Sequence, residues 1–265
     1  MQVKNEMYRN ALDWVTEAGE IIKERIHQTL DIKLKSSHSD LVTAVDREIE
    51  AYFVNNIRQH YPLHNILGEE NVGNTLSDSP YLWIIDPIDG TSNFINRKKD
   101  FAISVAFCCD DQGVFGIVYD VMAGKLYHAI KGEGAFLNEN RLDSINRSSV
   151  LENELVAVNT PWKDVEEIRQ WPQLYRLAAR VRGVRVYGAT TMELCDLATG
   201  SLGGFAQYFV NAWDYAAVRV ILEEIGGKFS DLQGNEIGMI YCGGVAAASI
   251  CVHEQMIQLL NAGPE

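Results

Sequence analysis

Apolar side chains recur every three or four residues along residues 5–28 and again along residues 43–60. This spacing gathers them on one face of an α-helix, so it predicts two long amphipathic helices. Proline cannot continue a helix, and Pro62 therefore predicts the end of the second one. The segment between the helices, residues 33–40, is polar and rich in serine, so we expect a loop there.

From residue 64 the apolar residues instead form short runs, which predict β-strands. These runs cover residues 64–68, 81–86, 101–109, 114–119, 125–130 and 135–137. Glycine-containing turns separate the last four, as is typical of hairpins in an antiparallel sheet. Residues 143–153 are polar and poorly periodic, which suggests a hinge between two halves of the chain.

Beyond residue 155 the helical and strand patterns alternate. Helices are predicted at residues 164–180, 190–199, 214–225 and 253–260, and strands at residues 184–187, 204–209 and 246–251. A chain of this length builds one large domain or two small ones. We expect one compact unit of two subdomains, α+β in residues 1–150 and α/β in residues 151–265.

The chain of 265 residues has an ordinary globular composition, 47% hydrophobic and 22% charged, but its formal net charge is −13. Nucleic-acid binding needs concentrated lysine and arginine, so the composition argues against nucleic acid as the main partner. An acidic surface also repels anionic substrates. A phosphate-ester substrate would therefore need metal ions to neutralise the local field.

The sequence predicts a soluble, cytoplasmic protein. Its five cysteines contain no Cys-x-x-Cys pair, which fits buried thiols in a reducing compartment. The N-terminal residues lack the apolar core of a signal peptide. The longest apolar stretches, residues 101–109 and 245–252, fall far short of the ~20 residues that a membrane span requires.

The strongest chemical signal is the run DPIDGT at residues 86–91, which directly follows an apolar strand. The fixed φ of Pro87 and the permissive backbone of Gly90 predict a tight turn that brings Asp86 and Asp89 to one side. Carboxylates that converge at a strand end suit a hard cation such as Mg²⁺, which prefers oxygen ligands. An isolated Asp-Gly pair is usually only a turn, but two carboxylates on either side of a rigid Pro-Ile favour a metal site.

The same turn supplies two further groups. We expect it to aim the carbonyl of Ile88 inward as a candidate third metal ligand. If residues 91–95 begin a helical turn, their free backbone N–H groups would hold a phosphate.

The other charged candidates carry a weaker signal, because each has an equally good structural explanation. Glu69 and Glu70 follow a short strand, where one of them could be a metal ligand or both could belong to a solvated loop. Asp214 begins a predicted helix, and aspartate is a favoured N-cap. Asp46 fits an exposed helical carboxylate, and Lys35 fits a free surface charge.

These residues together resemble the signatures of the inositol monophosphatase family. The matching segments are DLVTAVD at residues 40–46, ILGEE at 66–70, WIIDPIDGTSNF at 83–94, WDYAA at 213–217 and EIGG at 224–227. Their order and spacing agree along nearly the whole chain, and the DPIDGT match is highly specific. The resemblance implies a layered α-β-α-β-α sandwich, often dimeric, that binds two or three Mg²⁺ ions and is inhibited by lithium.

The resemblance also assigns roles to individual positions. The residues that bind Mg²⁺ would be Glu69, Asp86, Ile88 through its carbonyl, Asp89 and Asp214. The residues that activate the attacking water would be Asp46 and Thr91, with Glu69 assisting. The residues that meet the phosphate and the substrate would include Asp89, Gly90, Thr91 and Asp214. Lys35 matches a mobile-loop lysine near the most weakly bound metal ion. Most metal ligands then fall in residues 1–150.

The remaining substrate-facing positions lie in the second half of the chain. Gly188, Ala189 and Thr190 resemble the family's substrate-facing segment, whereas Gln207 departs from the family pattern. Inositol phosphatases usually carry an acidic residue at the position of Gln207, and glutamine loses the charge-assisted hydrogen bond to a ring hydroxyl. After Phe94 the usual His-Gly and Pro are replaced by INRKKD at residues 95–100, whose three basic side chains fit either a second phosphate or a solvated loop.

These departures leave several substrates open. Members of the family hydrolyse inositol monophosphate, the 2′-phosphate of NADP(H), fructose 1,6-bisphosphate or adenosine 3′,5′-bisphosphate. We expect a Mg²⁺-dependent phosphomonoesterase of broad specificity for inositol monophosphate, with NADP(H) as a second substrate. It would be a homodimer with no nucleic-acid or membrane partner. The alternative to an enzyme is a regulatory protein-binding member of the family. The complete set of metal ligands argues against this alternative.

Overall fold

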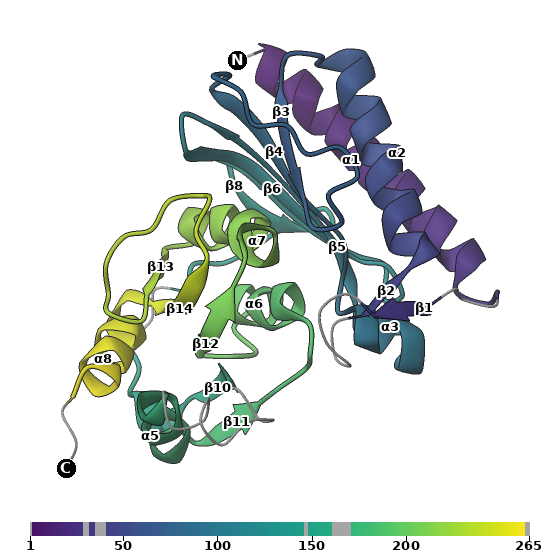
Figure 1. Ribbon diagram of the computed structural model, residues 1–265. Helices are drawn as coiled ribbons and strands as arrows, with labels where there is room; N and C mark the ends of the chain where they lie inside the picture. The colour runs from purple at the N-terminus through teal and green to yellow at the C-terminus, as the bar shows by residue number, and fades with distance from the viewer. Residues whose placement is uncertain (1, 29–31, 35–40, 146–147, 161–170, 263–265) are drawn as a thin grey trace.

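The computed structural model describes residues 2–28, 32–34, 41–145, 148–160 and 171–262. In this part of the chain two large sheets alternate with three layers of helices, which gives the expected α-β-α-β-α sandwich (Figure 1). No helix among these residues is long and apolar enough to cross a membrane.

The first layer is a pair of helices, α1 (Gln2–Arg25) and α2 (Ala44–His60), which confirms the two amphipathic helices predicted from the spacing. Their apolar sides pack on one face of the larger sheet, where Phe53 of α2 and Trp83 of the sheet belong to one buried core. The packing of these two faces removes large apolar side chains from water and so stabilises the layer.

The larger sheet forms the second layer. Its strands are β3 (Asn65–Gly68), β4 (Tyr81–Asp89), β5 (Ala102–Cys109), β6 (Gln112–Asp120), β7 (Lys125–Ile130), β8 (Gly134–Leu137) and β9 (Asn140–Arg141), in this order across the sheet. All neighbours are antiparallel except β3 and β4, so the predicted hairpins are confirmed. Side chains alternate between the two faces: Trp83 and Ile85 face α1 and α2, whereas Leu82 and Ile84 face the centre of the molecule.

The other three layers come from the second half of the chain. The smaller sheet consists of β10 (Leu155–Asn159), β11 (Gly183–Arg185), β12 (Gly204–Val210), β13 (Gly227–Asp231) and β14 (Gly243–Ser249), in the order β11-β10-β12-β14-β13. The helices α6 (Thr190–Ala198) and α7 (Ala212–Glu224) lie between the two sheets, and α5 (Pro172–Arg180) and α8 (Ile250–Leu260) cover the outer face (Figure 1). The division into two subdomains near residue 150 stays a prediction.

Several boundaries differ from those predicted. The strand β13 was not expected, because GKFSD has no clear alternation and owes its extended form to pairing with β14. The strand β14 begins at Gly243 rather than at residue 246, and α8 begins at Ile250 rather than at residue 253. The short elements that were not predicted are a hairpin of β1 (Ile32–Leu34) and β2 (Leu41–Thr43), the two-residue strand β9 and the 3₁₀ turn η1 (Leu151–Asn153). The helix α3 (Thr91–Arg97) begins at the helical turn considered for residues 91–95. Residues 164–170 of a predicted helix lie outside the described residues.

The backbone of the central helix α7 lies directly against the larger sheet at Gly116 of β6. A Cβ atom built on Gly116 would lie only 2.0 Å from the backbone oxygen of Ala217 in α7. The strand therefore meets the helix backbone directly, and only glycine leaves room for it. This contact fixes the distance between the sheet and the helix whose first turn carries Asp214.

Replacing Gly116 with Ala should push α7 away from β6 and lower the free energy of unfolding by about 3 kcal/mol, in the upper range for overpacking. Gly124 provides the control, because its φ is +64° but nothing lies within 4 Å of its ideal Cβ. Gly124→Ala should cost only backbone strain, about 1 kcal/mol. Chemical denaturation of both variants measures the difference, and equal costs would show that the contact at Gly116 relaxes without strain.

Candidate metal and phosphate site

The run DPIDGT forms the turn between β4 and α3. Gly90 has a φ of +87° and directly precedes α3, so the helical turn expected at residues 91–95 is confirmed. Asp86 fixes the turn from within, because its Oδ1 accepts a 3.0 Å hydrogen bond from the Ile88 N–H. A Cβ on Gly90 would lie 2.9 Å from the Cβ of Ala189, so the turn also brings the two halves of the chain into contact.

Three carboxylates from distant parts of the chain meet at this turn. Asp86 and Asp89 lie near the end of β4, Asp214 lies in the first turn of α7, and each offers an oxygen within 4.8 Å of the others. The first two are buried and Asp214 is half-buried. Burial raises the pKa of Asp86 well above its ordinary value, and the nearby charges of Glu69, Asp89 and Asp214 raise it further. The cluster is therefore a site where negative charge is costly without a cation.

Asp89 also holds the N-terminus of α6. Its Oδ1 accepts a hydrogen bond from the Thr190 N–H at 3.2 Å, and its Oδ2 accepts one from the Thr191 N–H at 2.7 Å and one from the Thr191 hydroxyl. Burial raises the pKa of Asp89 to about 6, although the bonds from Thr191 oppose the shift. The positive end of the helix thus stabilises a carboxylate that burial and the charge of Glu69 destabilise.

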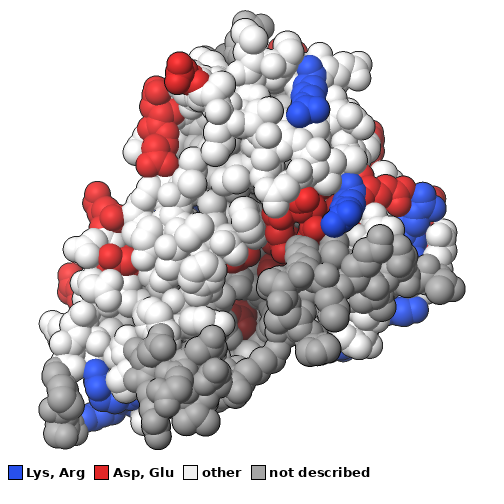
Figure 2. Space-filling view, viewed as in Figure 1, with Lys and Arg blue, Asp and Glu red and all other residues white. Residues whose placement is uncertain are grey.

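Glu69 reaches the same place from the loop after β3. Its N–H donates a 3.2 Å hydrogen bond to the carbonyl of Ile85, directly before Asp86. Its charge contributes to the raised pKa values of Asp46, Asp86 and Asp89. The structure therefore brings Glu69 to the aspartates, as the sequence predicted. Acidic atoms also appear within the hollow between the larger sheet and α6 in the space-filling view (Figure 2).

Asp46 is fully buried and faces Thr91. The Thr91 hydroxyl lies 3.2 Å from Asp46 Oδ1 and 3.1 Å from the carbonyl oxygen of Ile88. The other carboxylate oxygen, Oδ2, accepts a 2.9 Å hydrogen bond from the Thr43 N–H in the capping box of α2. The alternative of an exposed helical carboxylate is therefore wrong for Asp46.

Asp214 is not the N-cap of α7. Asn211 is the N-cap, and Asp214 follows three residues later, where its Oδ2 accepts a 2.7 Å hydrogen bond from the Asn211 N–H. Asp46 and Asp214 thus occupy equivalent positions in two capping boxes. In each box one carboxylate oxygen anchors the side chain to the backbone at the start of a helix.

The predicted substrate-facing segment lies beside the turn. Gly188 has a φ of +76°, and Ala189 directly precedes α6. Asn93 of α3 fixes the segment in place, because its Nδ2 donates 2.8 Å hydrogen bonds to the carbonyls of both Tyr187 and Asp100. A buried amide therefore adds a further link between α3 and the segment before α6.

Gln207 lies next to this segment, but its amide is already engaged. Its Oε1 accepts hydrogen bonds at 3.1 Å from the Thr190 hydroxyl and from Asn159 Nδ2. Its Nε2 donates a 2.8 Å bond to the carbonyl of Phe209. Both ends of the side chain are thus held by the protein.

The whole chain is similar to proteins of one family. A model described as the inositol monophosphatase family matches residues 3–264. The chain belongs to this family. The inositol-1-monophosphatase of Bacillus subtilis is 38% identical over 251 residues, which cover 94% of each protein. Two crystal structures are similar to this chain. SaIMPase-II with bound inositol monophosphate is 29% identical, with a TM-score of 0.84 over 96% of this chain and 92% of that one. An IMPase/NADP phosphatase with Mg²⁺ and phosphate is 26% identical, with a TM-score of 0.88 over 98% of this chain and 97% of that one.

The donors that this inositol monophosphatase family member presents fit Mg²⁺. The cluster of Asp86, Asp89 and Asp214 offers only oxygen atoms, and no histidine or cysteine of the described residues joins it. Mg²⁺ is a hard cation that takes oxygen ligands. A divalent cation would also relieve the repulsion that raises the pKa values of Asp86 and Asp89.

Two buried glutamates support the site and were not predicted. Glu193 of α6 accepts a 2.5 Å hydrogen bond from the Tyr187 N–H, and burial raises its pKa to about 7. Glu50 of α2 accepts bonds from the N–H groups of Glu70 and Val72 at 2.6 and 2.7 Å. The sequence offers one signal for each, an acidic residue on the apolar face of a predicted helix. It does not show which loop each side chain holds, because the fold decides which loop lies beside the helix.

The charge of the basic segment at the end of α3, residues 97–99, is partly neutralised. Arg97 pairs with Asp100 at 2.6 Å, while Lys98 and Lys99 are exposed. One of the three basic side chains that could meet a second phosphate is therefore already paired with an acid. Lys35 lies outside the described residues.

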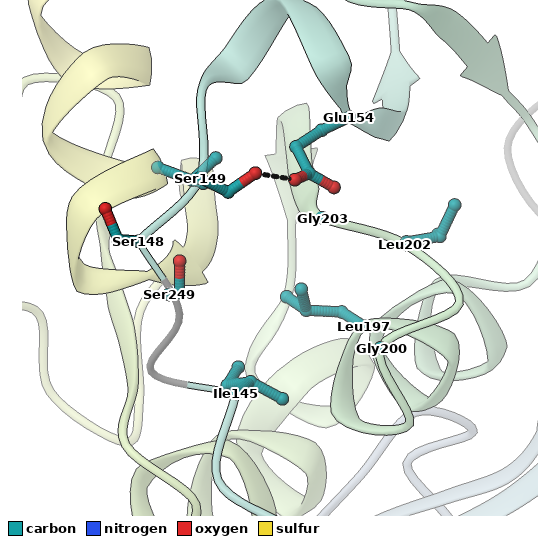
Figure 3. Close-up of a pocket in the computed structure, with 10 residues that line it drawn as sticks. Ile145, Ser148, Ser149, Glu154, Leu197, Gly200, Leu202, Gly203 and Ser249 are labelled. Carbon is teal, nitrogen blue, oxygen red and sulfur yellow. Dashed lines mark hydrogen bonds between the residues drawn. The ribbon is translucent and has the colours of Figure 1, made fainter.

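A separate cavity of about 180 Å³ lies at the C-terminal end of α6 (Figure 3). Its lining includes Leu197 and Glu154, whose carboxylate accepts a hydrogen bond from the Ser149 hydroxyl. The N-terminal end of the same helix, at Thr190, contacts Asp89. The cavity is therefore distinct from the acidic cluster.

Adding MgCl₂ should stabilise the protein against thermal unfolding, because a divalent cation bound only by the folded state shifts the equilibrium toward it. At a concentration about 100 times its Kd, the gain would be about 2.7 kcal/mol. Differential scanning calorimetry measures this gain, with NaCl at equal ionic strength as the control for screening. Asp214→Asn should reduce the gain, and a Mg²⁺ effect no larger than that of NaCl would contradict the metal site.

Proposed function

We propose that this chain is a Mg²⁺-dependent phosphomonoesterase that hydrolyses inositol monophosphate and, as a second substrate, the 2′-phosphate of NADP(H). The observation that carries the proposal is the convergence of three aspartates beside the contact between Asp46 and Thr91. The similar crystal structures support the substrates, since one contains inositol monophosphate and the other is an IMPase/NADP phosphatase.

The groups that would hold two or three Mg²⁺ ions are the carboxylates of Glu69, Asp86, Asp89 and Asp214 and the carbonyl of Ile88. When bound, Mg²⁺ would neutralise phosphate charge and make water acidic enough to ionise near neutral pH. The fold brings these carboxylates close together although their charges repel one another.

Thr91 and Asp46 would orient the attacking water. A hydroxyl donates one hydrogen bond and accepts two. When Thr91 donates to Asp46 Oδ1, its oxygen remains able to accept a hydrogen bond from a water molecule. Asp46 stays in place because Thr43 holds its other oxygen, and Glu69 would assist.

Gly90 and Thr91 would hold the phosphate. The first N–H groups of a helix have no partner within that helix and carry partial positive charge, so they favour an anion. The segment Gly188, Ala189 and Thr190 lies across from this turn and would face the rest of the substrate. The proposed enzyme thus binds the phosphate through the first half of the chain and the alcohol through the second.

The proposal is tested by phosphate release from four substrates: inositol 1-phosphate, NADP⁺, fructose 1,6-bisphosphate and adenosine 3′,5′-bisphosphate. We expect Mg²⁺-dependent release, fastest from the first and inhibited by lithium. Asp89→Asn is the control, and it should lower the rate by several orders of magnitude while the protein still unfolds cooperatively. Near-normal activity in Asp89→Asn would contradict the assigned site.

Release from none of the four substrates would favour the alternative, a regulatory protein-binding relative. Faster release from a bisphosphate than from inositol 1-phosphate would move the assignment to that substrate class. The proposed homodimer is measured separately, by light scattering of the purified protein.

Gln207→Glu should improve inositol 1-phosphate as a substrate. A carboxylate cannot donate to the carbonyl of Phe209, so the side chain would leave that bond and offer a charge-assisted hydrogen bond to a ring hydroxyl. We expect KM for inositol 1-phosphate to fall about tenfold, about 1.4 kcal/mol, with kcat little changed. NADP⁺ is the comparison substrate, and an equal change for both would show that Gln207 does not distinguish them.

A further inference from the structure

The loop that carries Glu69 is closed by its own side chains. Asn74 pairs with the backbone of Gly68, accepting a 2.7 Å hydrogen bond from its N–H and donating a 3.0 Å bond to its carbonyl. Asn71, with a φ of +58°, donates from Nδ2 to the carbonyl of Glu69 at 3.1 Å. These contacts give the loop a defined shape, but they do not attach it to the rest of the site.

Glu50 provides that attachment from α2. Its side chain is fully buried, and its two oxygens accept hydrogen bonds from the N–H groups of Glu70 at 2.6 Å and Val72 at 2.7 Å. The loop therefore wraps a carboxylate with its backbone N–H groups, as such groups wrap bound anions. A Cβ on Gly68 would lie 2.4 to 2.6 Å from this carboxylate, so the glycine is needed for the close approach.

The same helix controls two parts of the site. Asp46 and Glu50 are four residues apart in α2 and lie on the same helix face. Asp46 contacts Thr91, while Glu50 holds the residue that follows Glu69. The Glu69 N–H itself is bonded to the carbonyl of Ile85 in β4. The backbone at Glu69 is thus fixed on one side by its own hydrogen bond to β4, and on the other by the hydrogen bond from the next residue, Glu70, to α2.

We infer that Glu50 is a positioning residue for metal binding: it sets the Glu69 loop so that the Glu69 carboxylate reaches Asp86 and Asp89. This role rests on the proposed function, because it assumes that the cluster binds Mg²⁺. The carboxylate itself is required, since it accepts two hydrogen bonds with its two oxygens. A glutamine in its place would turn an NH₂ group toward one of the two N–H donors, and one bond would be lost.

The test is a calorimetric titration of Mg²⁺ into the full-length wild type and Glu50→Gln, without substrate. We expect Mg²⁺ to bind the variant about tenfold more weakly, the lower end of the usual effect of removing a group that orients a ligand. A merely structural role would lower the unfolding temperature and leave the Kd of the folded protein unchanged. Hydrogen exchange of the Glu70 and Val72 amides adds a second measurement. Both should be slow in the wild type, and the amide that loses its acceptor should be fast in Glu50→Gln.

Glu224 offers a matched control. It also accepts two backbone hydrogen bonds, from the N–H groups of Gly132 at 2.7 Å and Gly134 at 2.8 Å, but it holds the turn between β7 and β8. Glu224→Gln loses the same kind of bond without touching the Glu69 loop. Its Kd for Mg²⁺ should therefore equal that of the wild type.

The outcomes separate the two proposals. If the wild type binds no Mg²⁺, the proposed function fails and this role fails with it. If the wild type binds and Glu50→Gln binds equally well, or if Glu224→Gln weakens binding as much, only the role of Glu50 is overturned. If Glu50→Gln does not fold, Glu50→Asp takes its place, because it keeps the charge but withdraws the carboxylate by one methylene. Unchanged Mg²⁺ affinity in Glu50→Asp, or rapid exchange of the Glu70 and Val72 amides in the wild type, would also overturn the role.

Discussion

Repulsion among buried carboxylates is the constraint on which the rest of the site depends. Burial and neighbouring charges raise the pKa values of Asp86 and Asp89. Bringing these charged acids together therefore costs free energy when no cation is bound. The protein offsets part of this cost with a backbone N–H for each acid. The donors are Ile88 for Asp86, Thr191 for Asp89, Thr43 for Asp46 and Asn211 for Asp214. Each bond favours the charged carboxylate and also fixes its direction, so the same interaction stabilises and aligns the group.

The layered sandwich supplies these donors because four helices begin at the site. α2 and α7 present Asp46 and Asp214 in capping boxes, α3 starts after Gly90, and the first N–H groups of α6 meet Asp89. Each N-terminus contributes partial positive charge to a region that carries several negative charges. The position of α7 depends in turn on the direct contact of its backbone with Gly116. Packing in the central layer and electrostatics at the site are therefore linked through the same helix.

A feature could be predicted from the sequence when its interacting residues lie close together along the chain, and it was missed when they lie far apart. The two outer helices, the hairpins of the larger sheet and the turn at residues 86–91 rest on local patterns, and the structure confirms them. The two capping boxes were not predicted, although Thr43 and Asn211 each precede an aspartate by three residues. The other missed features depend on distant partners: β13 forms by pairing with β14, and Glu50 holds a loop twenty residues away, as its bond to Glu70 shows. No local spacing distinguishes such a glutamate from a solvated one.

The same difference explains why the chemistry is easier to infer than the substrate. The groups proposed for water activation and phosphate binding come from one turn and the starts of helices, where the covalent chain limits the geometry. The region proposed to face the substrate is instead built partly from side chains that fix one another over long separations in the chain, such as Asn159 and Gln207. Because Gln207 is held at both ends, its identity alone does not show which of its atoms a substrate could reach. Specificity therefore depends on whether a ligand's hydroxyls can compete with hydrogen bonds that the protein already makes.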